Sequence, residues 1–184
     1  HGASPGTGSG GATRDPGLVR PGAIGKPRFA KAWESARQGA IGKPADSAPP
    51  AGVDYDLWLG PAPARAFNRN RFHGSWRWFL DYGTGDLGND GVHRLDIARW
   101  ALETAVAAKG EKISAVPARV SALGGKYYFD DAQEWPDTLM VTYDYAEGYL
   151  MTYEMRIWSA YPLHEESEGA AVYGDEGSVV IGNG

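Results

Sequence analysis

The sequence contains no cysteine. Disulfide bonds, thiolate metal sites and a cysteine nucleophile are therefore excluded. No apolar run approaches the roughly 20 residues that a membrane-spanning helix needs, so no membrane partner is expected. Basic residues are outnumbered by acidic ones, and the formal net charge is −5. A nucleic-acid-binding protein needs a basic face, so this charge argues against a nucleic-acid partner.

The sequence also lacks a credible dinucleotide-binding fingerprint. Residues 6–11 match G-x-G-x-x-G literally, but no apolar strand precedes them. Pro16 and Gly17 disfavour a helix after them. The motif binds a pyrophosphate only between a strand and a helix N-terminus. We therefore expect no cofactor-binding residue in this chain.

The overall composition is that of one folded domain. Of 184 residues, 42% are hydrophobic and 22% are charged, which excludes wholesale disorder. Seven Trp and ten Tyr suit a core, and they equally suit a cleft where flat rings stack on sugars. Five of these Trp and Tyr residues, together with Phe67, Phe72 and Phe79, fall at about 38–82, where Pro and Gly break any periodicity. We expect an ordered aromatic loop insertion there.

Residues 89–108 are predicted to form a helix. Val92, Leu95, Ala98 and Leu102 recur at helical spacing, and Asn89 is a suitable N-cap. Strands are expected at 24–33, within 113–129, and in two hairpins at 139–158 and 170–181. Strands grouped around a segregated helix predict an α+β fold: an open, antiparallel-rich sheet with helices on one face.

The first long hairpin has one strongly apolar face. One strand contributes the row Leu139, Val141, Tyr143 and Tyr145. The other strand contributes the row Tyr149, Met151, Tyr153 and Met155. One helix covers only part of such a surface, so we expect the remainder to associate with a second copy. The sequence thus predicts a homo-oligomer that forms through the sheet.

Polar side chains that suit alcohol chemistry lie on one face of the predicted helix. Asn89, His93, Asp96 and Trp100 fall on adjacent turns. A neutral imidazole near a helix N-terminus can accept a proton from a hydroxyl group. Asp96 can orient that ring or bind a substrate hydroxyl, and Asn89 can hydrogen-bond a polyol. A purely structural His93–Asp96 pair that fixes the helix start is the competing interpretation.

Further candidates are less specific. His73 in the aromatic segment can line a cleft or simply pack at the surface. Lys31 can face the same pocket or lie on the sheet surface, and Trp78 is a candidate sugar-stacking ring. His93, Asp90 and Asp96 are not expected to bind a metal, since the two aspartates point in different directions from the histidine.

Residues 83–100 resemble a segment of the Gfo/Idh/MocA family, which includes glucose–fructose oxidoreductase, inositol dehydrogenase and MocA-type oxidoreductases. There a glycine turn enters a helix with the pattern Asp-x-Gly-x-His-x-x-Asp. Residues 89–96 read NDGVHRLD here, so Asn89 replaces the first aspartate of the pattern. Similarity extends over most of the chain, through residues 22–26, 53–63, 70–73, 76–78 and 174–178.

The resemblance implies a Rossmann domain that binds NAD or NADP, followed by an α+β domain. It implies that His93 is the catalytic histidine and that Asp96 lies in the substrate pocket. The family's Glu-Lys-Pro segment, whose lysine assists proton transfer, has no counterpart here. We interpret residues 1–22 as a Gly/Pro-rich remnant of the domain junction. Residues 23–184 are interpreted as the substrate-binding and oligomerisation domain, inactive without its Rossmann domain.

Three functions are consistent with this interpretation. The first is an NAD(P)-dependent oxidoreductase that acts on a sugar, polyol or derivative, with a sugar-like small molecule as partner. The second is a glycosidase that uses tightly held NAD to oxidise its substrate transiently and eliminate the glycosidic bond. The third is a non-catalytic, truncated domain whose sheet serves only for association.

Overall fold

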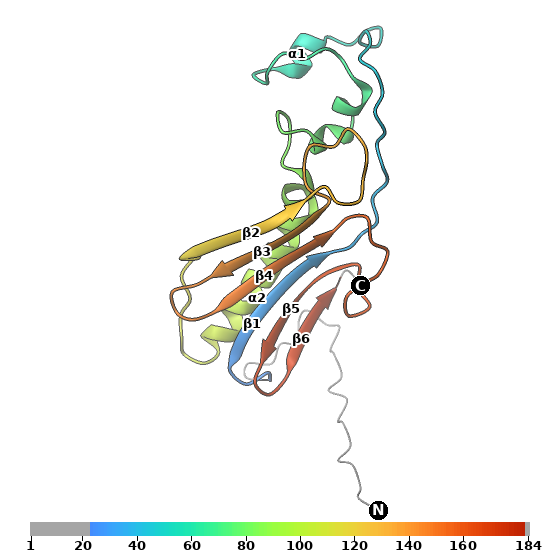
Figure 1. The fold of residues 1–184 in the computed structure, drawn as a ribbon. Coiled ribbons are helices and arrows are strands. Elements are labelled where there is room, and N and C mark those ends of the chain that lie inside the picture. The colour runs from blue at the N-terminus through green and yellow to red at the C-terminus, as the bar shows by residue number, and fades with distance from the viewer. Residues whose placement is uncertain (1–22, 183–184) are drawn as a thin grey trace, which may run out of the picture.

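A six-stranded sheet organises residues 23–182, the part of the chain that the computed structural model describes (Figure 1). The glycine-rich motif at 6–11 and the predicted junction at 1–22 lie outside the described residues. The strands are β1 (Pro27–Glu34), β2 (Arg119–Gly125), β3 (Thr138–Asp144), β4 (Leu150–Arg156), β5 (Glu168–Gly174) and β6 (Ser178–Gly182).

The spatial order of the strands is β2-β3-β4-β1-β5-β6. Strands β1 and β4 pair in parallel, and every other pair is antiparallel. Helix α2 (Val92–Ala107) packs across one face of this sheet (Figure 1). The predicted α+β class, with an open antiparallel-rich sheet and its helix on one face, is confirmed. Among residues 23–182, no helix combines the length and apolar character that crossing a bilayer requires.

Alternating hydrophobicity positions the long hairpin. Val141 lies opposite Tyr153, and Tyr143 lies opposite Met151, so the apolar rows of β3 and β4 share one face. Both predicted hairpins are present, as β3–β4 and β5–β6. The strand expected at 24–33 is β1, shifted by a few residues.

The predicted exposure of the apolar hairpin face is wrong. Tyr149, Met151 and Tyr153 are at most 4% exposed, as are Met155 and Val141. These side chains face α2 and form the hydrophobic core with it. Within residues 23–182, the opposite face of the sheet carries no helix (Figure 1). That open face carries both polar and apolar side chains, among them Thr152 and Met140.

The start of the long helix also differs from the prediction. A π-helical turn, η3 (Leu87–Gly91), leads directly into α2, so Asn89 lies inside a turn and does not cap the helix. Its side chain donates to Asp90 Oδ2 at 2.9 Å and accepts no backbone N–H group of the helix. A Cβ atom at Gly91 would lie 2.4 Å from the Tyr153 hydroxyl. Glycine thus lets the helix start approach β4 closely.

Residues 35–82 extend past one end of the sheet (Figure 1). They include α1 (Tyr55–Leu59) and the short 3₁₀ turns η1 (Arg69–Arg71) and η2 (Ser75–Trp78). Their aromatic rings contact one another, as Tyr55 does with Trp58 at a centroid distance of 5.6 Å. Hydrogen bonds from side chains to backbone carbonyls hold the rest of this segment in place. For example, Asn70 Nδ2 donates to the Ile41 carbonyl at 2.8 Å. This extension occupies the region in which we predicted an aromatic insertion.

Candidate active site

The outer face of α2 presents His93 and Asp96, and both are exposed. The inner face packs on the sheet, where Leu102 and Val106 are fully buried. Neither the side chain of His93 nor that of Asp96 makes a hydrogen bond or ion pair with another described residue. The structure therefore contains no His93–Asp96 bond of the kind that the structural interpretation of this pair requires. Both side chains are free to meet a ligand.

The same face continues in both directions along the helix. Asn89 is exposed one turn before His93, and Trp100 is 71% exposed one turn after Asp96. Val92 beside them is 48% exposed. Exposed apolar side chains beside a few polar groups are typical of a surface that another domain or a ligand covers.

Two arginines fix the helix that carries this face. Arg94 Nε donates to Glu168 Oε2 on β5 at 3.2 Å, and both side chains are largely buried. Arg99 Nη2 donates to the backbone carbonyl of Ser114 at 2.8 Å. Because the helix is held at two points, the backbone of His93 has a defined position relative to the sheet.

Lys31 lies away from this face. Lys31 lies opposite Thr152 where β1 pairs with β4, and its side chain is on the open side of the sheet. There it forms an ion pair with Glu154. His93 is on the helix-covered side, so the structure does not bring Lys31 to the predicted pocket. The alternation of β1 predicted that Lys31 faces opposite to its neighbours, but it did not reveal which face the helix covers.

The two candidates from the aromatic segment, Trp78 and His73, lie in different environments. Trp78 is 2% exposed in the hydrophobic core, with the Arg77 guanidinium 4.5 Å from its ring centroid. This burial removes Trp78 from the set of residues that can stack on a sugar. His73 is exposed next to η1, and its ring packs on Phe72 at a centroid distance of 4.1 Å.

A buried cluster of carboxyl groups lies under the start of α2, and sequence reasoning missed it. Glu34 at the end of β1 and Asp86 before η3 are 0% and 1% exposed. One oxygen atom of each, with one of half-buried Asp90, lies within 4.8 Å of the others. Burial, followed by the nearby Asp86, raises the pKa of Glu34 well above its usual range. Burial likewise raises the pKa of Asp86.

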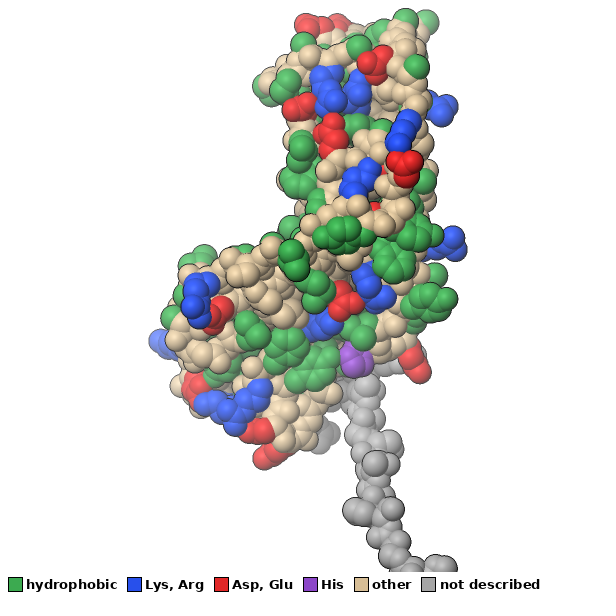
Figure 2. Space-filling view, viewed as in Figure 1, with side chains coloured by type: hydrophobic (Ala, Val, Ile, Leu, Met, Phe, Trp, Pro, Cys, Tyr) green, Lys and Arg blue, Asp and Glu red, His purple; other side chains and the backbone are tan. Residues whose placement is uncertain are grey.

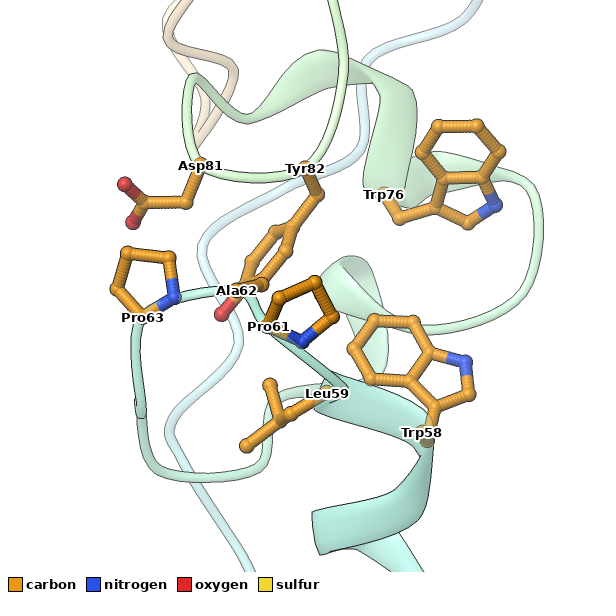
Figure 3. A pocket seen from close by; sticks show the side chains of 8 residues that line it. All are labelled: Trp58, Leu59, Pro61, Ala62, Pro63, Trp76, Asp81 and Tyr82. Carbon is orange, nitrogen blue, oxygen red and sulfur yellow. The ribbon is translucent and has the colours of Figure 1, made fainter.

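A separate cavity of about 520 Å³ opens in the extension (Figure 3). Trp58, Trp76 and Tyr82 give it aromatic walls, and Pro61 lies between them (Figure 3). Asp81 on its rim accepts a hydrogen bond from Arg65 Nη1 at 2.9 Å. None of its lining residues belongs to α2. The cavity is therefore distinct from the His93 face.

Solved structures of oxidoreductases share this fold. Aldose-aldose oxidoreductase from Caulobacter crescentus, complexed with glycerol, is 17% identical, with a TM-score of 0.52 over 89% of this chain. An NAD binding oxidoreductase from Klebsiella pneumoniae is 16% identical, with a TM-score of 0.51 over 90%. The WlbA dehydrogenase from Bordetella pertussis, in complex with NADH and UDP-GlcNAcA, is 15% identical, with a TM-score of 0.50 over 88%.

The chain spans only 35–37% of the length of these three proteins. At such low identity the likeness shows the fold alone. No curated protein sequence matches the chain. The Gfo/Idh/MocA family model, described as "Oxidoreductase family, C-terminal alpha/beta domain", matches residues 29–155. Since this match takes in β1 to β4 together with α2, the chain belongs to the Gfo/Idh/MocA oxidoreductase family and contains its C-terminal domain.

Proposed function

We propose that this chain is the substrate-binding portion of an NAD(P)-dependent oxidoreductase that acts on a sugar, polyol or related alcohol. The observation that carries the proposal is the exposed His93–Asp96 face, which has no partner among the described residues. Family membership supports the redox chemistry. The glycerol and UDP-GlcNAcA complexes of similarly folded proteins support a hydroxyl-rich substrate.

In this proposal the imidazole of His93 accepts the hydroxyl proton as the alcohol carbon becomes a carbonyl. A nicotinamide bound by another domain would supply the acceptor for the hydride that leaves that carbon. Asp96 and Asn89 hydrogen-bond neighbouring hydroxyls and hold the reacting carbon beside the imidazole. His73 is a further candidate substrate contact from the extension. His93 then releases its proton to water, which completes the proton balance.

Cofactor binding is assigned to a domain outside this chain. Among residues 23–182, the one parallel strand pair has no glycine-rich turn that leads from a strand into a helix N-terminus. The described residues therefore do not fit a dinucleotide pyrophosphate.

The isolated chain is accordingly expected to show no saturable affinity for NADH. Titration followed by nicotinamide fluorescence measures this affinity directly. Saturable binding at micromolar concentrations would show that the chain contains a cofactor site, contrary to the proposal.

Two other functions remain distinguishable by experiment. An oxidoreductase releases NADH in proportion to the substrate consumed. A glycosidase that oxidises only transiently releases free sugar with no net NADH. Assays of the full-length protein with NAD and a panel of free sugars, polyols and glycosides separate these outcomes. Absence of both products would favour the third function, a non-catalytic association domain.

We further propose that the open face of the sheet pairs with a second copy. Exposed apolar side chains lie on it, including Leu123 at 79% and Met140 at 44%. Lys31 and Glu154 place charges of both signs at its centre, so an isologous contact can pair opposite charges. Figure 2 shows hydrophobic and charged side chains side by side over the strands.

Replacing Met140 by lysine is therefore expected to weaken dimerisation at least about tenfold, since the ammonium group would lose its water in the contact. Its cross-strand neighbour Glu154 is already paired with Lys31 and Arg156. Light scattering coupled to size exclusion measures the change. Leu57→Lys is the matched control, because Leu57 is 78% exposed in the extension, away from the sheet. A wild-type chain that stays monomeric well above micromolar concentration would exclude this interface.

A further inference from the structure

The carboxyl groups of Glu34, Asp86 and Asp90 come from two segments that are far apart in the sequence. β1 delivers Glu34 to the helix-covered side of the sheet, and the turn before α2 delivers both aspartates. One oxygen of each group lies within 4.8 Å of the other two. Oxygen atoms that surround a Ca²⁺ ion at about 2.4 Å are at most about 4.8 Å apart. The three groups are therefore spaced as ligands of one ion.

The buried oxygen atoms of this cluster have no donor. Neither oxygen of Glu34 nor of Asp86 accepts a hydrogen bond from a donor among the described residues. The two carboxyl groups can bond only to each other, and that bond requires one of them to carry a proton. Buried carboxylates are normally paired or hydrogen-bonded, so four orphaned oxygen atoms require an explanation.

A second, independent group points into the same space. Tyr153 on β4 is fully buried, and its hydroxyl has no hydrogen-bond partner among the described residues. The hydroxyl lies against the backbone of Gly91, the residue after Asp90. The unpartnered hydroxyl therefore has an oxygen atom available as a neutral metal ligand.

The nearby arginines make no hydrogen bond to the buried carboxyl groups, although the charge of Arg77 favours the ionised form of Asp86. Arg94 is bound to Glu168. The Arg77 guanidinium donates to the Gly74 carbonyl and lies over the Trp78 ring. Neither arginine hydrogen-bonds Glu34 or Asp86. Two buried carboxyl groups without a basic partner are stable only if they hold protons or a metal cation.

We propose that Glu34, Asp86 and Asp90 bind a hard divalent cation of the size of Ca²⁺, with the Tyr153 hydroxyl as a fourth oxygen ligand. An all-oxygen, carboxylate-rich donor set selects Ca²⁺, Mn²⁺ or Mg²⁺ over zinc or copper. Half-buried Asp90 leaves the ion a route from solvent. The set differs from His93, Asp90 and Asp96, which we did not expect to bind a metal.

Such an ion would join three elements at one point. It would tie the end of β1 and the middle of β4 to the turn that starts α2, the helix that carries His93. Its role is structural, because it lies beneath the helix and not on the exposed face. Binding should therefore stabilise the fold whether or not the chain is part of an active enzyme.

Calorimetric titration of the EDTA-treated chain with CaCl₂, and then with MnCl₂ and MgCl₂, tests the site. We expect saturable binding of one Ca²⁺ ion and a rise in Tm of roughly 5–10 °C at one hundred times Kd. Asp90→Asn, at a half-exposed position that tolerates an amide, should weaken Ca²⁺ binding at least tenfold. Glu34→Gln should abolish it.

Glu103→Gln is the matched control, since Glu103 forms only a surface ion pair with Arg99. It should leave Ca²⁺ affinity unchanged. The proposal is overturned if the wild-type chain shows no saturable binding below about millimolar Ca²⁺ and no change in Tm. It is equally overturned if Asp90→Asn and Glu34→Gln bind Ca²⁺ as tightly as the wild type. Either result would mean that a shared proton, and not a metal ion, stabilises the buried pair Glu34 and Asp86.

Discussion

Replacing His93 by alanine in the full-length enzyme is expected to lower turnover by about two to four orders of magnitude, the range for loss of a general acid–base group. The side chain is exposed and makes no bond within residues 23–182, so its removal takes no packing from the core. Tm should therefore change little. NAD affinity should also stay constant, because cofactor binding is assigned to another domain.

Steady-state kinetics, thermal denaturation and NAD titration on the same preparation separate catalysis from folding. His164→Asn is the matched control: it removes a histidine that bonds to Tyr173 on β5, away from α2. Asparagine tolerates the positive φ of 53° at this position. This variant should retain turnover. If His93→Ala keeps near-normal turnover with a normal melting curve, His93 is not the proton-transfer group.

The Asp96→Asn variant distinguishes a substrate-binding role of Asp96 from a role in orienting the imidazole. Asp96 is exposed and unpaired within the described chain, so it contributes nothing to the helix that an amide cannot replace. A substrate-binding aspartate raises KM when changed, whereas one that orients the imidazole in the complex lowers kcat. A fall in Tm without either kinetic change would indicate a structural role instead.

Local patterns in the sequence predicted the elements that have strong periodicity. Alternation in residues 139–158 predicted the β3–β4 hairpin, including which residues share a face. Helical spacing predicted α2, with Ala98 and Leu102 toward the core. These patterns depend only on neighbouring residues, and a period of two or 3.6 residues is sufficient to detect them.

What the sequence did not reveal depends on contacts between distant segments. Alternation shows that a strand has two faces, but not which of them the helix covers. For this reason the sequence left both positions of Lys31 open, and it misjudged the exposure of the Tyr149 row. Gly91 packs against Tyr153 of a distant strand, and Asn89 falls inside the π-helical turn that ends at Gly91. Glu34 and Asp86 meet only because the sheet and the helix pack together, and no local pattern marks such an encounter.

Replacing Asp137 by alanine is expected to destabilise the fold by about 3–4 kcal/mol and to lower Tm by roughly 10 °C. Asp137 is fully buried where the chain enters β3. Its carboxylate accepts backbone N–H groups from Tyr127, Tyr128 and Phe129 at 2.9–3.1 Å. Thr138 Oγ1 donates to it at 2.8 Å. Alanine leaves three backbone donors of the β2–β3 connection without an acceptor.

The same bonds predict a dependence on pH. Burial alone would raise the pKa of Asp137, but the three backbone donors and Thr138 outweigh it and hold the pKa below its usual value. When the pKa of a carboxyl group is lower in the folded state, the carboxylate stabilises the fold at pH values above its unfolded-state pKa of about 3.9. This stability is lost as the pH falls through the folded-state pKa. Wild-type Tm should therefore fall more steeply below about pH 4 than that of Asp137→Asn, which has no carboxylate to protonate.

Asp144→Ala, at the other end of β3, is the matched control. Asp144 forms an ion pair with Arg119, whose side chain is 81% exposed, so its loss should cost less than about 1 kcal/mol. Urea denaturation of the three variants and the wild type gives the comparison. Equal stabilities for Asp137→Ala and Asp144→Ala would contradict the argument. That result would mean that the connection between β2 and β3 stays folded without the buried acceptor, with water in place of the carboxylate.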